Sequence, residues 1–202
     1  MGETEFRLVL LRHGETEWSK ARKHTGRTDV PLTPLGREQA RAAARVIARL
    51  SLRDPLVLTS PKQRAVQTAE LAGLPDPRLD DDLVEWDYGD FEGLTTTQIQ
   101  QNVPDWTIFT HPAPGGETAD QVRDRADRVL ASVLPALDER DVVLVGHGHF
   151  SRALIARWAE FPVREGRRFF LSTGAISVLG YEHQARTVLA HNLVPELDGA
   201  AS

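Results

Sequence analysis

The sequence predicts an α/β fold, in which an open and mostly parallel sheet carries helices on both faces. Three short apolar runs, residues 8–11, 56–58 and 142–145, have the composition of buried parallel strands. Each run is followed at once by polar, glycine or proline residues and then by a helical pattern. The 202 residues suit one α/β domain, and no linker or internal repeat divides them, so we expect a single domain over residues 1–202.

Helix start signals follow the first two predicted strands. A Thr-Pro pair at residues 33–34 predicts a helix, because threonine caps a helix well and proline suits its first turn. Small and aliphatic side chains within residues 40–50 then recur on one face of that helix. A Ser-Pro pair at residues 60–61 predicts a second helix, which Gly73 should close.

The remaining elements continue the alternation. We expect helices over residues 118–137 and 150–158, and the last section, 175–182 and 186–192, alternates like a pair of strands. Residues 84–117 are rich in Trp, Gly, Thr and Pro and lack a regular pattern. They are predicted to lie as a lid over one end of the sheet.

Composition excludes several classes of function. A formal charge of −5 argues against a nucleic-acid partner or a basic membrane-binding patch. The absence of cysteine excludes a thiolate nucleophile and any cysteine-based zinc site. The first residues lack the pattern of a secretory leader, and residues 8–11 are too short to span a bilayer, so a cytoplasmic location is expected.

Two predicted strand ends carry histidine beside glycine. Residues 12–14 (Arg-His-Gly) follow the first strand, and residues 146–149 (Gly-His-Gly-His) follow the third. Arg64 lies one turn into the helix after the second strand. Ligands of such sheets bind beyond the carboxyl ends of the strands, so these groups should converge there. We expect the other histidines, at positions 24, 111, 183 and 191, to be ordinary surface or core residues.

A phosphate group matches such a cluster of cationic side chains, because arginine binds phosphate through paired hydrogen bonds. Without a Cβ, Gly14 and Gly148 would let backbone N–H groups approach phosphate oxygens. Glu85 supplies a carboxyl group that could protonate a leaving alkoxide, and its apolar neighbours Val84 and Trp86 should favour the neutral form. An acidic pH optimum is therefore predicted.

Six segments carry a family resemblance: LLRHGETEWS, HTGRTDVPLTPLGREQA, SPKQRAVQTAE, EWDYGDFEG, PGGETADQVRDR and VVLVGHGHFSR. In this order they resemble the sequence blocks of the histidine phosphatase superfamily, in its phosphoglycerate mutase-like branch. Together they run from residue 8 to about 152, and the ending HNL also fits. The resemblance implies a three-layer α/β/α sandwich around a mixed sheet with one antiparallel strand, and no metal or other cofactor.

The resemblance also implies roles for individual residues. His13 would become phosphorylated, and Glu85 would protonate the leaving oxygen and then activate water. The phosphate would be held by Arg12, Arg64 and His147, with further substrate contacts at Gly14, Ser19, Thr25, Gly26 and Gly148. Ser19 stands where the family usually has asparagine. For His149 two readings stay open: a partner of phosphate or Glu85, or simply a residue at a helix N-terminus.

Three functions compete within this resemblance. The glycolytic mutases have an arginine after the catalytic glutamate and then a long basic segment, whereas this chain has Trp86 and no Lys or Arg in residues 92–116. A phosphatase is therefore favoured over a mutase. An inactive phosphate-binding module is disfavoured because nucleophile, arginines and acid are all present.

The substrate is left as a small phosphomonoester or a sugar bisphosphate cut at one end. Five aromatic residues of the predicted lid form either a substrate wall or core packing: Trp86, Tyr88, Phe91, Trp106 and Phe109. Relatives occur as monomers and homodimers, and both states stay open here.

Overall fold

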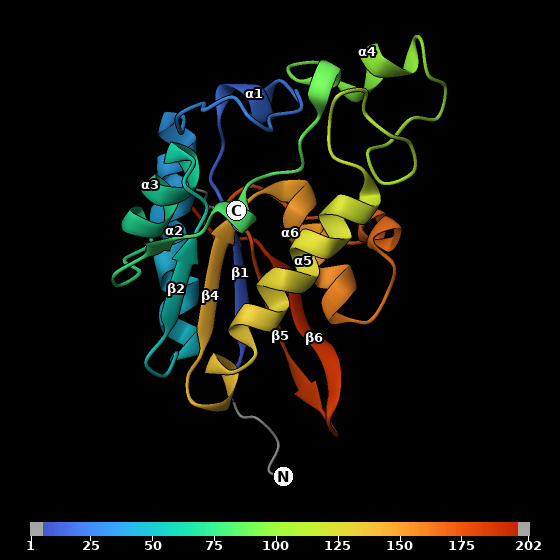
Figure 1. The fold of residues 1–202 in the computed structure, drawn as a ribbon. Helices are drawn as coiled ribbons and strands as arrows, with labels where there is room; N and C mark the ends of the chain where they lie inside the picture. The colour runs from blue at the N-terminus through green and yellow to red at the C-terminus, as the bar shows by residue number, and fades with distance from the viewer. Residues whose placement is uncertain (1–5, 198–202) are drawn as a thin grey trace.

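The computed structural model describes residues 6–197 and has a six-stranded sheet at its centre (Figure 1). The strands are β1 (Leu8–Arg12), β2 (Leu56–Thr59), β3 (Arg78–Leu79), β4 (Val142–Gly146), β5 (Ile176–Glu182) and β6 (Ala185–Leu193). Their order is β3-β2-β4-β1-β5-β6, and only β5 runs against the direction of β1. The predicted mixed, mostly parallel sheet and its two-strand finish are confirmed.

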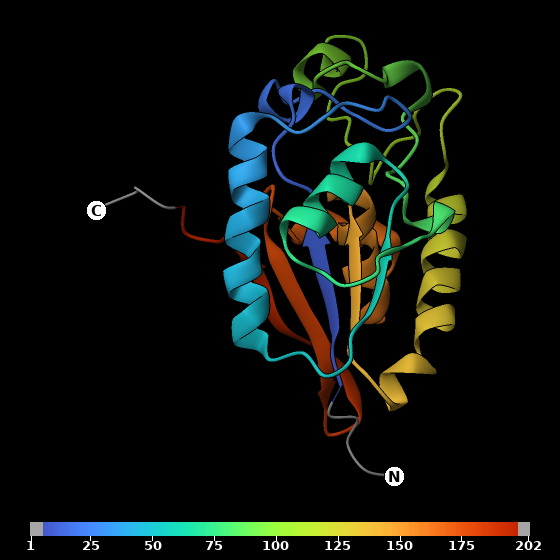
Figure 2. The same cartoon turned by 90° about the vertical axis from the view of Figure 1, so that its left-hand side faces the viewer.

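Helices cover both faces of this sheet (Figure 2). The α-helices are α1 (Glu17–Lys20), α2 (Pro34–Leu50), α3 (Gln63–Leu71), α4 (Thr96–Gln100), α5 (Ala119–Val133) and α6 (Gly148–Trp158). Short 3-10 segments are η1 (Asp81–Leu83), η2 (Gly89–Phe91), η3 (Ala136–Asp138) and η4 (Val163–Arg168). Within residues 6–197, no helix has the length and apolar character needed to cross a membrane.

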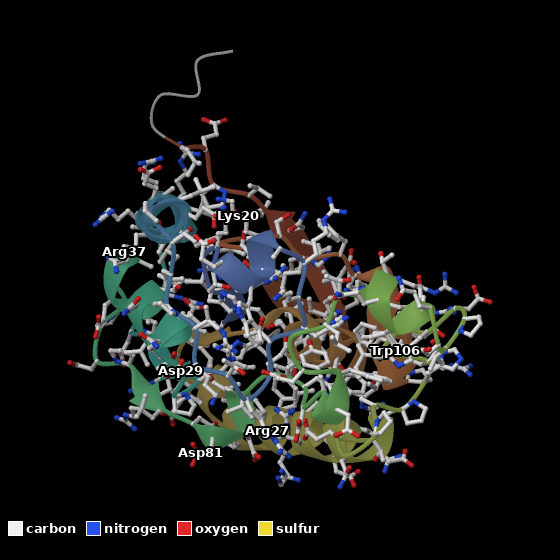
Figure 3. All side chains as sticks on the ribbon, turned by 90° about the horizontal axis from the view of Figure 1, so that it is seen from above. Lys20, Arg27, Asp29, Arg37, Asp81 and Trp106 are labelled. Carbon is white, nitrogen blue, oxygen red and sulfur yellow. The ribbon has the colours of Figure 1, made fainter. Side chains whose placement is uncertain are left out.

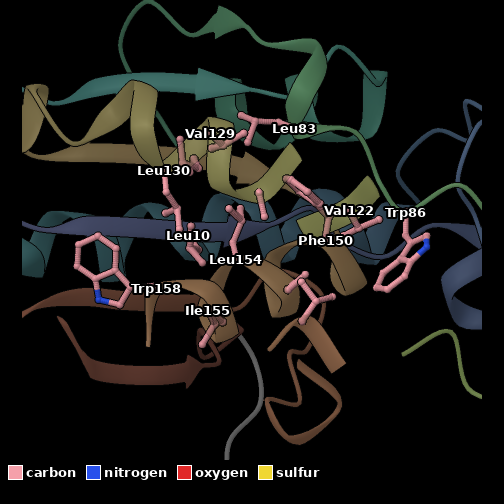
Figure 4. Close-up of a cluster of buried hydrophobic side chains, with 14 of the residues drawn as sticks. Leu10, Leu83, Trp86, Val122, Val129, Leu130, Phe150, Leu154, Ile155 and Trp158 are labelled. Atoms are coloured by element: carbon pink, nitrogen blue, oxygen red, sulfur yellow. The ribbon is translucent and has the colours of Figure 1, made fainter. Parts of the chain in front are cut away.

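Alternating side chains of β1 enter two separate cores. Leu8 and Leu10 pack with α5 and α6, whereas Val9 and Leu11 pack with α2 and α3. The α5–α6 core is the larger one and extends to Trp158 at one end and Trp86 at the other (Figure 4). Burying each large apolar side chain contributes about 1.5–3 kcal/mol, so the strand ends rest on a rigid base.

Two helix ends differ from the sequence prediction. Helix α3 begins at Gln63 with Lys62 at its N-cap, and no side chain caps it, whereas the Ser60 hydroxyl accepts from Lys62 N at 3.4 Å and lies 2.8 Å from His147 Nε2. Helix α5 stops at Val133, and Pro135 starts the separate turn η3. The threonine cap of α2 is confirmed, since Thr33 accepts a hydrogen bond from the backbone of that helix's first turn.

Several segments lie above the carboxyl ends of β1, β2 and β4. They include α1, η2, α4 and the loops of residues 84–117 (Figure 1). Figure 3 looks down on this end of the molecule, with Trp106 among the segment that follows α4. The site described next lies beneath these segments.

Candidate active site

The ends of β1 and β4 and the start of α3 bring three side chains together. The rings of His13 and His147 are 5.2 Å apart between centroids. Arg64 donates from Nε to His147 Nδ1 at 3.2 Å. All three side chains are buried, at 5%, 0% and 0% exposure, so the carboxyl edge of the sheet holds a dense cluster of nitrogen atoms.

His13 has the protonation pattern of a nucleophile. Its Nδ1 lies 2.7 Å from the carbonyl oxygen of Gly14, and because a carbonyl only accepts, the proton is on Nδ1. The lone pair is therefore on Nε2. Burial, with the charges of Arg64 and Arg12, lowers the pKa of His13 well below 6.5. The ring is thus neutral and ready to attack.

The lowered pKa of His13 predicts how kcat/KM changes on the acid side of its pH profile. A histidine with a pKa of 6.5 would be about tenfold less available at pH 5.5, because only the neutral ring attacks. We expect no such tenfold loss, since the lowered pKa keeps His13 neutral at that pH. The pH dependence of kcat/KM for the free enzyme checks this, and an acid limb centred near pH 6.5 would contradict it.

Each side-chain nitrogen of Arg64 and His147 is hydrogen-bonded to another group of the protein. Arg64 donates to the carbonyl oxygens of Thr28 at 2.8 Å, Thr25 at 3.2 Å and Gly26 at 3.4 Å. Because His147 Nδ1 accepts from Arg64, its Nε2 carries the proton and donates to Ser60 Oγ at 2.8 Å. Ser60 is thus a site residue that the sequence indicated only as a helix cap.

Glu85 is held by the amino end of α6. Its Oε1 accepts from the backbone N–H of Trp86 at 2.9 Å and of Phe150 at 2.7 Å, while Oε2 accepts from that of His149 at 3.0 Å. These three backbone donors fix the orientation of the carboxyl group in the wall of the site. Oε2 accepts one bond only and keeps a lone pair for a proton.

A cavity of about 520 Å³ lies over these groups. It is lined by Arg12, His13, Ser19, Arg22, Lys23, His24, Thr25, Glu85, Tyr88, Thr96, Gly148, His149, Arg152, Phe170, Leu171, Ser172 and Thr173. Four of the predicted site residues are not part of its lining: Gly14, Gly26, Arg64 and His147. Among residues 6–197, no three His, Asp or Glu side chains are grouped in a way that could hold a metal ion.

The backbone N–H groups of Gly14 and Gly26 both have protein partners. The N–H of Gly14 donates to Thr68 Oγ1 at 3.1 Å, and a Cβ at this position would lie 2.1 Å from the Gly36 carbonyl oxygen. The N–H of Gly26 donates to the Glu92 carboxylate at 2.9 Å. In this arrangement neither N–H is free for a phosphate oxygen, and the substrate contacts predicted for the two residues stay predictions.

Arg12 lines the cavity and has a buried nitrogen without a partner among the described residues. Its Nη1 donates to the carbonyl of Leu171, whereas Nε is buried without a partner in the described part of the chain. Gly148 gives the guanidinium room, since a Cβ there would lie 3.1 Å from Arg12 Cζ. The Leu171 loop is itself held by Asn192, whose Oδ1 accepts from Ser172 N at 2.7 Å. An unpaired buried donor costs about 1–3 kcal/mol, and a phosphate oxygen would satisfy it.

Ser19 lines the cavity but its hydroxyl has a structural task. It donates to Thr16 O at 3.1 Å and accepts from Thr16 N at 2.9 Å, which closes the capping box of α1. Thr25 also lines the cavity, and its hydroxyl donates to Lys23 O at 3.1 Å.

His149 contributes more than a helix start. Its backbone holds Glu85, and its Nδ1 lies 2.6 Å from the Tyr88 hydroxyl. The side chain also lines the cavity. Of the five lid aromatics, only Tyr88 lines this cavity, and Trp86 packs into the core at 1% exposure.

His24 was predicted to be an ordinary surface or core residue, and the structure buries it in the wall of the cavity. Its ring is tilted against Tyr88, at 4.7 Å, and meets Trp106 edge to face, at 5.2 Å between ring centroids. Its place within HTGRTD, one of the six family-like segments, was the available signal. Arg152 and the wall of residues 170–173 were also missed, and Arg152 had only its place at the end of the sixth segment as a signal.

The burial of His24 predicts acid sensitivity of the fold. Burial lowers the pKa of His24 from 6.5 to about 4. Between these pH values the unfolded chain binds the extra proton, so stability is present above pH 6.5 and is lost as the pH falls towards 4. We expect His24→Gln to reduce the loss in the free energy of unfolding by about 1 kcal/mol per pH unit, as measured by urea unfolding at pH 7, 6 and 5. The same dependence of the free energy of unfolding on pH in the wild type and the variant would contradict this.

Comparison with known proteins identifies the relatives of this chain. The family model described as histidine phosphatase superfamily (branch 1) matches residues 8–194. An acid phosphatase of Mycobacterium tuberculosis is 50% identical over 92% of both chains. Sedoheptulose 1,7-bisphosphatase of Saccharomyces cerevisiae is 34% identical over 79% of this chain and 69% of its own length.

Solved structures agree with the fold. The product of the Mycobacterium tuberculosis open reading frame Rv3214 has a TM-score of 0.92 at 48% identity, covering 94% of this chain and 98% of its own. A mycobacterial glucosyl-3-phosphoglycerate phosphatase complexed with VO3 has a TM-score of 0.82 at 31% identity, covering 93% and 99%. The predicted three-layer fold of the mutase-like branch is therefore confirmed.

Proposed function

Because the chain belongs to branch 1 of the histidine phosphatase superfamily, we propose that it is a metal-independent phosphatase acting through a phosphohistidine on His13. The observation that carries this proposal is the neutral His13 ring, with its lone pair on Nε2, in the lining of the cavity beside Arg12 and Glu85. Similarity to an acid phosphatase over 92% of the chain supports it.

The reaction consists of two displacements. His13 Nε2 attacks phosphorus, the N–P bond forms, and the P–O ester bond breaks with its electron pair on the alcohol oxygen. Glu85 gives that oxygen its proton. Water then attacks phosphorus, Glu85 takes the proton of the water, and the N–P bond breaks to release phosphate and restore His13. Since Glu85 must begin protonated, activity should be highest at acidic pH.

The cationic groups stabilise the charge on the transferring phosphoryl group. Arg12 offers its unpaired Nε, and Gly148 leaves space beside it. Arg64 and the neutral ring of His147 lie outside the cavity lining in the resting arrangement. Arg64 reaches the phosphate only when it exchanges its carbonyl partners for phosphate oxygens.

We also infer that residues 6–197 form one histidine phosphatase domain with residues 84–117 as its lid, while the ends of the predicted range, 1–5 and 198–202, lie outside the described residues. Glu85, Tyr88 and Thr96 of this segment all line the cavity. Small phosphomonoesters, including sugar bisphosphates cut at one end, are the proposed substrates. The named activities of the relatives, which are phosphatases of different esters, support this class.

Phosphate release from a panel of esters, with EDTA present, tests the proposal. The panel includes 3-phosphoglycerate, a sugar bisphosphate and benzyl phosphate. We expect release that EDTA leaves unchanged and that is fastest at acidic pH. No release from any ester would overturn the proposal, and conversion of 3-phosphoglycerate to 2-phosphoglycerate would replace it with a mutase.

A further inference from the structure

A side chamber of about 180 Å³ adjoins the main cavity. Four residues line both spaces: His24, Thr96, His149 and Arg152. The remaining walls of the chamber come from residues 106–109 and Arg167. A molecule whose phosphate lies at His13 can therefore extend past His149 into a second, separately walled space.

Four of the nine residues that line this chamber have ring side chains. His24 meets Trp106 edge to face at 5.2 Å, and His149 meets Phe109 in the same way at 5.4 Å between centroids. Burial lowers the pKa of both histidines, so these rings are neutral near pH 7. Cavities of about 150 Å³ with apolar walls hold one benzene molecule, so the side chamber has room for one ring.

Arg152 supplies a positive charge where the two spaces meet. From α6 it donates to the carbonyl oxygens of Gly166 at 3.0 Å and Arg167 at 2.8 Å, and it lies 4.8 Å above the Phe109 ring. Within residues 6–197, no carboxylate lies at ion-pair distance from it, and its Nη1 donates no hydrogen bond. Its charge is therefore available to a ligand.

The free donors of Arg152 favour a carboxylate on that ligand. Arg167, the other cation of the chamber, shares the single carboxylate of Glu165 with Arg164 and Arg168. Arg152 has no carboxylate partner among the described residues, and its planar guanidinium fits a carboxylate through two parallel hydrogen bonds.

We propose that the side chamber binds the alcohol part of the substrate and selects an alcohol with a planar ring that carries a carboxylate, which pairs with Arg152. This inference rests on the proposed phosphatase function and defines its substrate class.

Matched benzyl phosphates test the inference without any variant. 3- and 4-carboxybenzyl phosphate are compared with the corresponding carboxamides, which have the same shape and nearly the same leaving group but no charge. We expect kcat/KM to be on the order of 10- to 100-fold higher for at least one carboxylate than for its carboxamide. Equal values in both pairs would overturn the inference while the phosphatase function stands.

Arg152→Met assigns the preference to this residue. It should remove the carboxylate preference, so that kcat/KM becomes equal within about twofold for each carboxylate and its carboxamide. Arg157→Met is the matched control, because Arg157 lies on the same helix, also donates to a backbone carbonyl, and lines neither space. A preference that survives in Arg152→Met would overturn the inference. If the wild type releases phosphate from other esters but from no benzyl ester, the inference fails while the phosphatase function stands. If it releases phosphate from no ester at all, the proposed function itself fails.

Discussion

His13→Ala is expected to lower kcat/KM for every phosphomonoester by about 10⁴-fold or more, since removing a covalent nucleophile removes the pathway itself. No neighbouring side chain can replace it. The ring of His147 is the nearest candidate, but its Nδ1 accepts from Arg64 and its Nε2 donates to Ser60, so it has no free lone pair. Phosphate release with the panel of esters measures the effect.

His111→Ala serves as the control for this experiment. His111 lines neither the main cavity nor the side chamber, and its ring bonds only to Thr110 in the described chain. Wild-type activity is expected for this variant. If His13→Ala retained more than about one hundredth of the wild-type rate with an unchanged pH profile, a nucleophilic role of His13 would be untenable.

Glu85→Gln is expected to lower the rate according to the leaving group. An alkyl phosphate must receive a proton as it departs, so its kcat should fall by about 10²- to 10⁴-fold. The leaving group of p-nitrophenyl phosphate is the stabilised p-nitrophenolate anion, which needs no proton, so kcat for this ester should fall much less. The ratio of the two rates isolates proton donation from any general damage to the site.

The same variant should also lose stability. All three hydrogen bonds of Glu85 come from backbone N–H donors, and the amide group of glutamine would turn a fourth donor towards one of them. A loss of about 1–3 kcal/mol in the free energy of unfolding is expected. Glu70→Gln, on the exposed side of α3, should change neither stability nor rate. An equal fall for both esters would argue against Glu85 as the proton donor.

The fold was predictable because its signals are local and repeat. Each buried strand is a run of aliphatic residues that ends in glycine or polar residues, and the threonine before α2 caps it as expected. The start of α3 was not predictable in this way. A Ser-Pro pair reads as a helix start, but here Ser60 bonds to His147, a residue 87 positions away, and a local pattern contains no such information.

The sequence indicated which residues gather at the site, but not which hydrogen bonds they make there. The strand ends placed His13, Arg12 and His147 together, because parallel strands share their carboxyl edge. Which N–H groups were free was not predictable. Gly14 and Gly26 carry donors that Thr68 and Glu92 occupy, and these partners come from distant parts of the chain. The walls supplied by Arg152 and residues 170–173 depend likewise on tertiary packing and carry no pattern of their own.

The stereochemical course at phosphorus tests the central claim most directly. A phosphorothioate monoester made chiral with labelled oxygen is hydrolysed in water that carries a third oxygen isotope, and the configuration of the product is determined. Two in-line displacements, first by His13 Nε2 and then by water, invert the phosphorus twice, so the account predicts overall retention. Inversion would mean that water attacks the ester directly, and it would contradict the phosphohistidine intermediate.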